Sequence, residues 1–192
     1  MHPFILRSWH AAARLLRSLW FAIRPRPGRV DCNGRIRFNV SLHCDGQGRV
    51  VLGDGVSFGY GLASKVGSGA VRLQARGRES LIKIGTETSF SNEVQIFAER
   101  SVTVGSRCLI GDSVLIVDSD FHDLSPESRH SGPATIEPVV IEDNVFIGSR
   151  AIILKGVTIG QDSVIGAGSV VTRSIPPRTV AAGNPAKVIR PL

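Results

Sequence analysis

The sequence predicts an all-β fold in which short strands stack coil upon coil, and two observations carry that prediction. The first is a six-residue repeat, which runs from residue 141 to residue 176 as IEDNVF, IGSRAI, ILKGVT, IGQDSV, IGAGSV and VTRSIP. Its first position is Ile or Val in all six units. The second is the unit length, which matches neither the 3.6-residue turn of a helix nor the two-residue period of a long strand. Each unit therefore holds one short strand and one corner.

The repeat also predicts which side chains form the core. The bulky first residue and the small fifth residue of each unit should point inward, and Gly or Asn near the corner lets the backbone turn. Stacked units then bury a continuous aliphatic column and pair each backbone group with the coil above or below. An ordinary sandwich with hairpin turns would not keep a strict period of six.

The first 30 residues differ in character from the rest of the 192-residue chain. They carry six arginines and no acidic residue, whereas residues 31–192 carry 17 basic and 16 acidic residues. On a helix, one face is apolar and includes Trp9 and Trp20, and most of the arginines lie roughly opposite. The prolines of RPRPGR, residues 24–29, then end the helix. We expect residues 1–30 to form a basic amphipathic helix with a Pro-rich linker, and residues 31–192 to form the β domain.

Two interpretations of this helix stay open. It either makes a peripheral membrane contact through residues 1–24, or packs on the protein or on a neighbouring subunit. Arg7, Arg14 and Arg17 interrupt the apolar stretch, so neither a signal peptide nor a membrane span is expected. Nucleic acid is not expected as a partner, because a phosphate-tracking surface would not need the apolar stripe.

Upstream of residue 141 the repeat is looser and then breaks. Units IGTETS, FSNEVQ and IFAERS start at residue 84, and after a two-residue slip VGSRCL, IGDSVL and IVDSDF start at residue 104. The next unit should begin with an aliphatic residue, but His122 stands there, among charged side chains that a dry core would not accept. We predict that residues 117–139 form a loop projecting from the coil, where chemistry is often placed on a rigid scaffold.

Units of this kind, with an aliphatic first position and a small fifth position, resemble the hexapeptide-repeat acyltransferases. The resemblance implies a left-handed parallel β-helix with three units per coil, assembled as a homotrimer. The left hand comes from the resemblance alone, because parallel strand connections generally favour the right hand. The resemblance is closest to the maltose and galactoside O-acetyltransferase branch and its relatives in surface-polysaccharide synthesis. It covers about residues 80–190 well and residues 31–79 only in style, and residues 141–189 match that branch's C-terminal half almost unit for unit.

The resemblance also implies a catalytic base in the loop. The stretch HDLSPESR, residues 122–129, is similar to the family's His-x-Leu-x-Pro-Glu-x-Arg stretch, which makes His122 the expected general base. An imidazole that titrates near neutrality can take the proton from a sugar hydroxyl as the oxygen attacks acetyl-CoA. A carboxylate can orient the ring, and the sequence does not rank Asp118 against Asp120 for this task.

Further positions match the family's binding residues. The resemblance implies that acetyl-CoA, the acyl donor, lies in a groove between neighbouring β-helices, with basic side chains meeting its phosphates. Asn92 and Glu99 are the nearest matches to acceptor-binding residues. The matching donor positions are Phe146, which replaces a frequent Trp, Gly148, Ser149, Ala167, Thr172, Arg173, Lys187 and Arg190.

The activity predicted in this way is O-acetylation of a sugar or a glycan precursor. N-acetylation of an amino sugar and a non-catalytic assembly role are the alternatives. No metal is expected, because zinc enzymes of this fold use three histidines and only His122 and His130 lie in the relevant half. Three cysteines without paired spacing indicate a reducing compartment. We therefore expect the protein in the cytoplasm, at the cytoplasmic face of the membrane if the N-terminal helix binds lipid.

Overall fold

The computed structural model describes residues 29–60 and 69–192. The amphipathic helix predicted within residues 1–30 therefore lies outside the described residues. The described part of the chain consists of twenty strands and their connections, without a helix. Within it, no helix is long and apolar enough to cross a membrane.

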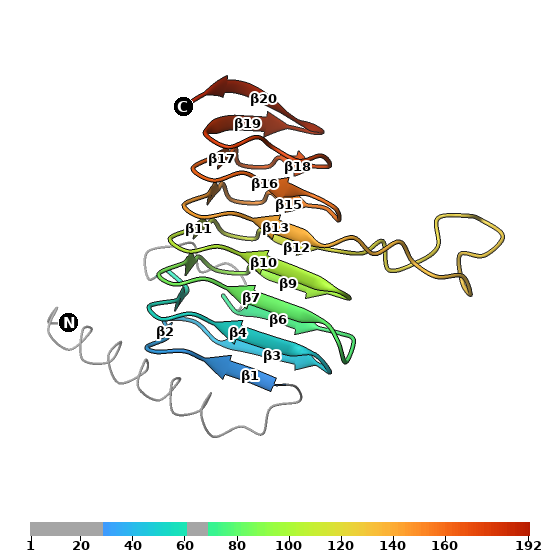
Figure 1. Ribbon diagram of the computed structural model, residues 1–192, viewed down its shortest axis with the longest axis horizontal. Helices are drawn as coiled ribbons and strands as arrows, with labels where there is room; N and C mark the ends of the chain where they lie inside the picture. The colour runs from blue at the N-terminus through green and yellow to red at the C-terminus, as the bar shows by residue number, and fades with distance from the viewer. Residues whose placement is uncertain (1–28, 61–68) are drawn as a thin grey trace, which may run out of the picture.

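The strands form three sheets, and each full coil contributes one strand to every sheet (Figure 1). Sheet A contains β1 (Arg29–Cys32), β4 (Arg49–Leu52), β7 (Leu81–Ile84), β10 (Ser101–Val104), β13 (Val139–Ile141) and β16 (Thr158–Ile159). Sheet B contains β2 (Arg37–Phe38), β5 (Ser57–Phe58), β8 (Ser89–Phe90), β11 (Leu109–Ile110), β14 (Phe146–Ile147), β17 (Val164–Ile165), β19 (Thr179–Gly183) and β20 (Ala186–Pro191). Sheet C contains β3 (Leu42–Gly46), β6 (Val71–Ala75), β9 (Gln95–Ala98), β12 (Leu115–Val117), β15 (Ile152–Ile153) and β18 (Val170–Val171).

The register of the sheets shows how many units make one coil. Ile141 pairs with Ile159 in sheet A and Ile147 pairs with Ile165 in sheet B, so each partner lies three six-residue units further on. The strands pair in parallel, except that β20 runs antiparallel to β19 at the C-terminal end. The chain is the left-handed parallel β-helix that the sequence predicted, with three units per coil.

The first and fifth positions of the repeat fill the coil as predicted. In the six units from residue 141 to residue 176, all of these side chains are at most 5% exposed. Two of them are polar and are satisfied inside the coil. The Ser163 hydroxyl donates to the carbonyl of Pro176 at 2.8 Å, and the Ser169 hydroxyl accepts a hydrogen bond from the amide of Gly183 at 3.1 Å. Both buried hydroxyls therefore have a hydrogen-bond partner.

The looser N-terminal repeats keep the same column with larger side chains. Phe38, Phe58 and Phe90 stand on three successive strands of sheet B and point inward. Their ring centroids are 5.9 Å and 5.2 Å apart and the rings are nearly parallel. Aromatic pairs at such separations add favourable contacts to the burial of apolar surface.

The fourth position of a unit turns the chain at a corner. Asn144, Arg150 and Asp162 have φ angles of 56°, 62° and 61°, in the left-handed region that residues other than glycine seldom adopt. The same corner stacks from coil to coil, since Asn144 Nδ2 donates to Asp162 Oδ1 at 2.7 Å. These contacts between coils offset the strain of the turn.

One long excursion leaves this scaffold, between β12 and β13, and projects far from the coil (Figure 1). Its base is a narrow neck in which Ser119 and Ile136 form an antiparallel bridge. The amide of Asp120 donates to the carbonyl of Thr135 at 3.1 Å within the same neck. The projecting loop that the broken repeat predicted is therefore present, with its two ends hydrogen-bonded together.

Candidate active site

The three sheets meet at three edges, and two of these edges carry most of the predicted site residues. The corners between a strand of sheet C and the next strand of sheet A form the C–A edge. The corners between a strand of sheet B and the next strand of sheet C form the B–C edge. Each coil visits the sheets in the order A, B, C, so the strand order alone assigns every corner to an edge.

His122 lies on the loop of the C–A edge, five residues after β12, and its side chain is exposed. Asp123 holds the residues that follow it in a turn through side-chain hydrogen bonds. Its carboxylate accepts hydrogen bonds from the amide of Ser125 at 3.0 Å and from the hydroxyl of Ser128 at 2.6 Å. The Ser128 hydroxyl, and then the Ser125 amide, lower the pKa of Asp123. His122 is thus presented to solvent at the start of a hydrogen-bonded turn.

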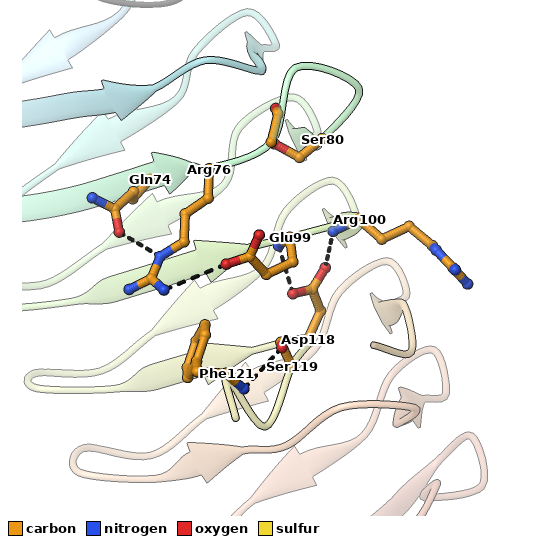
Figure 2. A network of polar contacts seen from close by, with 9 residues as sticks. Gln74, Arg76, Ser80, Glu99, Arg100, Asp118, Ser119 and Phe121 are labelled. Atoms are coloured by element: carbon orange, nitrogen blue, oxygen red, sulfur yellow. Dashed lines mark hydrogen bonds and ion pairs between the residues drawn. The ribbon is translucent and has the colours of Figure 1, made fainter. Parts of the chain in front are cut away.

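Asp118 is fully buried, and its carboxylate binds backbone amides of the neighbouring coil. Its Oδ1 accepts from the amide of Glu99, and its Oδ2 accepts from the amides of Arg100 and Ser101, each at 2.7 Å (Figure 2). Hydrogen bonds of this charge-assisted kind are short and strong. The two-residue slip of the repeat falls at this corner, between β9 and β10, so Asp118 satisfies the amides of a wider turn.

Asp120 has a different environment from Asp118. Its Oδ1 forms an ion pair with Lys155 Nζ at 3.0 Å, which joins the loop to the corner of the next coil. Its Oδ2 is buried and has no hydrogen-bond partner within residues 29–60 and 69–192. Of the two carboxylates predicted to orient His122, Asp120 therefore keeps an acceptor atom, whereas both oxygens of Asp118 are engaged.

The two predicted acceptor residues lie on different edges of the chain. Glu99 is on the C–A edge, where Arg76 Nη1 approaches its Oε1 at 3.4 Å. Asn92 is on the B–C edge and only 5% exposed. The Asn92 side-chain Oδ1 accepts from the backbone amide of Tyr60 at 3.1 Å, and the Asn92 backbone amide donates to Asp112 Oδ1 at 2.9 Å. One chain therefore does not bring Asn92 and Glu99 to a common site.

Three of the predicted donor residues meet on the B–C edge, namely Gly148, Ser149 and Ala167. The amide of Gly168 donates to the carbonyl of Ser149 at 2.9 Å, which locks the two corners together. A Cβ on Gly148 would lie 2.5 Å from the backbone nitrogen of Ala167, so a side chain does not fit there. Two successive coils are in close contact at these three positions, which the resemblance assigns to binding of the acyl donor.

The outer face of sheet B holds a groove of about 850 Å³ that extends from β2 to β14. Phe146 and Leu109 line one end of it and are 46% and 54% exposed. Ser57 and Ser89 also line it, and their hydroxyls are 2.9 Å apart. This volume lies in the range of small-molecule sites. Of the predicted donor residues, Phe146 lines this groove.

The remaining donor residues are exposed on the last coils. Thr172 and Arg173 follow β18, and Lys187 and Arg190 lie on β20. The Arg190 guanidinium donates to the carbonyl of Pro191 at 3.0 Å. In the described ranges, no three or more His, Cys, Asp or Glu side chains gather in a group that could hold a metal ion.

The predicted site residues are thus divided between edges of one coil. His122, Asp118, Asp120 and Glu99 share the C–A edge, whereas the glycine corner of the predicted donor groove is on the B–C edge. One chain therefore places His122 and Gly148 on different edges of the coil.

Two residues at the C–A edge were not predicted from the sequence, namely Lys155 and Arg76. Lys155 was readable in principle, because Ile116 pairs with Ile153 and this register places Lys155 beside the corner from which the loop leaves. Arg76 belongs to the looser part of the repeat, and no local signal indicates that it contacts the loop.

The model for the hexapeptide repeat of succinyl-transferase matches residues 138–173. Galactoside O-acetyltransferase of Escherichia coli (strain K12) is 43% identical over 111 residues, which cover 58% of this chain and 54% of that protein. The galactoside O-acetyltransferase of Lactococcus lactis is 38% identical over 109 residues, covering 57% and 52%. The chain spans about half the length of these curated relatives.

Solved structures extend the similarity over most of the chain. A hexapeptide-repeat-containing acetyltransferase from Vibrio cholerae, complexed with acetyl-coenzyme A, is 27% identical with a TM-score of 0.59, covering 87% of this chain and 72% of that one. A galactoside acetyltransferase in complex with coenzyme A is 43% identical with a TM-score of 0.55, covering 57% and 55%. A polySia-specific acetyltransferase is 26% identical with a TM-score of 0.59, covering 88% and 84%. Fold, repeat and relatives together define a hexapeptide-repeat protein. The chain is similar to hexapeptide-repeat acetyltransferases in its repeat, its coil and its sequence, in agreement with the resemblance.

Proposed function

We propose that this protein transfers the acetyl group of acetyl-CoA to a hydroxyl group of a sugar or a glycan precursor. The observation that carries the proposal is the position of His122, exposed on a loop that projects from an acetyltransferase-family coil. The acetyl-CoA and CoA complexes of related structures support the donor. The two galactoside O-acetyltransferases among the relatives support a sugar hydroxyl as the acceptor.

The chemistry is a direct transfer. The imidazole of His122 takes the proton of the acceptor hydroxyl while the oxygen attacks the thioester carbonyl. The tetrahedral intermediate then collapses, the carbon–sulfur bond breaks, and the CoA thiolate takes the proton from the imidazolium. Asp120 orients the ring and stabilises the imidazolium through Oδ2, the atom without a partner in the described part of the chain.

The donor site is completed between subunits of a homotrimer. His122 of one subunit faces the B–C edge of a neighbour, where Gly148, Ser149 and Ala167 bring two coils together. The division of these residues between two edges of one chain supports this arrangement. The basic side chains of the last coils then receive the CoA phosphates.

Release of free thiol from acetyl-CoA tests the proposal, with a panel of nucleotide sugars, polyprenyl-linked glycans and amino sugars as acceptors. The wild type should release thiol with a hydroxyl acceptor. His122→Ala should lower turnover by about 10² to 10⁴-fold, the usual contribution of a general base, and should still bind CoA. Acetylation of an amino sugar on nitrogen alone would support the N-acetyltransferase alternative instead.

His130→Ala is the matched control, because His130 is also exposed on the same loop, eight residues further on. It should keep turnover near that of the wild type. Near-normal turnover of His122→Ala, or an equal loss in both variants, would remove His122 from the mechanism.

A further inference from the structure

The residue before His122 has a backbone conformation that must be held by its surroundings. Phe121 has a φ of 62°, in the left-handed region, which is a rare conformation for a bulky side chain. Such a residue persists only where neighbouring groups determine its position. Because Phe121 and His122 share a peptide bond, the groups that hold Phe121 also set the direction in which His122 leaves the coil.

Three groups contact Phe121 at this point. The Ser119 hydroxyl accepts a hydrogen bond from the Phe121 amide at 2.9 Å. The ring of Phe97, on β9, meets the Phe121 ring edge to face, with centroids 6.4 Å apart and planes at 83°. The guanidinium of Arg76 covers the Phe121 ring, with its central carbon 4.4 Å from the ring centroid. Figure 2 shows Arg76 extending from the coil toward Phe121.

Arg76 is itself fixed to the scaffold, so it can act as a support. Its Nε donates to Gln74 Oε1 at 2.8 Å, and its Nη1 lies 3.4 Å from Glu99 Oε1 (Figure 2). Its backbone amide donates to the carbonyl of Ala98 on the next coil at 2.8 Å. The guanidinium carbon also lies 5.5 Å from the centroid of Phe97. The same planar group thus contacts a ring of the coil and a ring of the loop.

We propose that Arg76 is a positioning residue for His122, which it fixes by stacking on Phe121. The proposal rests on the proposed function, in which His122 is the general base. A flat guanidinium can cover an aromatic face and keep its in-plane hydrogen bonds to Gln74 and Glu99, whereas a lysine ammonium offers only a point charge. Arg76 follows β6, which is separated from the loop's own strand, β12, by β9, and it does not need to touch the substrate for this role.

The test compares Arg76→Lys with Arg72→Lys. Arg72 lies on β6, close to Arg76 in sequence, and is likewise an exposed arginine with a carboxylate partner, since its Nε and Nη2 donate to Asp45. Arg76→Lys should lower kcat about 10- to 100-fold, as misplacement of a catalytic group does, while KM for acetyl-CoA and Tm stay near the wild-type values. Arg72→Lys should leave kcat unchanged. A wild-type kcat for Arg76→Lys, or an equal loss in both variants, overturns the proposal.

Variants of Phe121 test the backbone part of the inference. Glycine enters the left-handed region without strain, whereas alanine does not. Phe121→Gly should therefore retain about fivefold more turnover than Phe121→Ala, although both lack the ring on which Arg76 stacks. Equal turnover in the two variants would show that the left-handed conformation does not matter for His122.

A readout without turnover separates this proposal from the proposed function. The imidazole resonances of His122, assigned by comparison with His122→Ala, should shift or broaden in Arg76→Lys and stay unchanged in Arg72→Lys. If the wild type acetylates no acceptor of the panel but these resonances respond, the function fails and the positioning contact stands. If turnover is normal in the wild type and the resonances ignore Arg76→Lys, the positioning role fails alone.

Discussion

Two aspartates at the base of the loop have different hydrogen-bonding environments, although they lie on the same edge of the β-helix. Asp118 is 0% exposed, and its carboxylate oxygens accept hydrogen bonds from three backbone amides of the corner between β9 and β10. Asp120 points to Lys155 and keeps one buried oxygen without a partner in the described part of the chain. A carboxylate that already accepts several amide hydrogen bonds gains little from a further donor. If His122 is the general base that we propose, we expect Asp120 rather than Asp118 to orient its ring.

At the residue scale, replacement of Asp118 should destabilise the coil. Asp118→Ala leaves the amides of Glu99, Arg100 and Ser101 without their acceptor and should lower the free energy of unfolding by about 3 kcal/mol. In a chain of this size that corresponds to a fall in Tm of roughly 6 to 12 °C in thermal unfolding.

Asp31→Ala is the control for this prediction. Asp31 is a carboxylate whose partner, Arg49, is 54% exposed, and surface ion pairs of this kind contribute at most about 1 kcal/mol. Similar Tm values for Asp118→Ala and Asp31→Ala would show that the buried carboxylate does not hold the corner.

At the scale of the element, the last strands combine two tasks. β20 pairs antiparallel with β19 and closes the end of sheet B, while it presents Lys187 and Arg190 to solvent. CoA should raise the Tm of the wild type, because a ligand that binds only the folded state stabilises it. Arg173→Ala combined with Lys187→Ala should reduce this rise by removing two phosphate partners, and an undiminished rise would place the phosphates elsewhere.

The same scale shows what a periodic sequence predicts. One period decides which side chains face inward, so the burial of positions 141, 147 and 153, the stacking of coils and the projecting loop all follow from it. The bonds of Asp118 and the stacking of Arg76 on Phe121 do not follow, because they join separate coils across a slip in the repeat. Local sequence carries no signal for the distance between such side chains. The catalytic roles of His122 and the donor positions stay predictions.

At the scale of the whole molecule, the predicted site residues occupy different edges of a three-sided coil. His122 follows sheet C, whereas Gly148, Ser149 and Ala167 follow sheet B. A closed ring of identical subunits brings one edge of each chain against a different edge of the next. In the proposed homotrimer, each of three equivalent sites would take its base from one subunit and its donor groove from another.

Mixed trimers test this arrangement directly. His122→Ala removes the base, and Ala167→Trp fills the donor groove beside Gly148, where Ala167 is exposed. Each homotrimer should be inactive, but in trimers formed at random from equal amounts of both, about a quarter of the interfaces pair an intact His122 with an intact groove. Co-expression followed by thiol-release assays should therefore recover about a quarter of wild-type turnover. Co-expression of His122→Ala with a chain that carries both substitutions is the control and should recover none, and an inactive mixture of the two single variants would place the whole site within one chain.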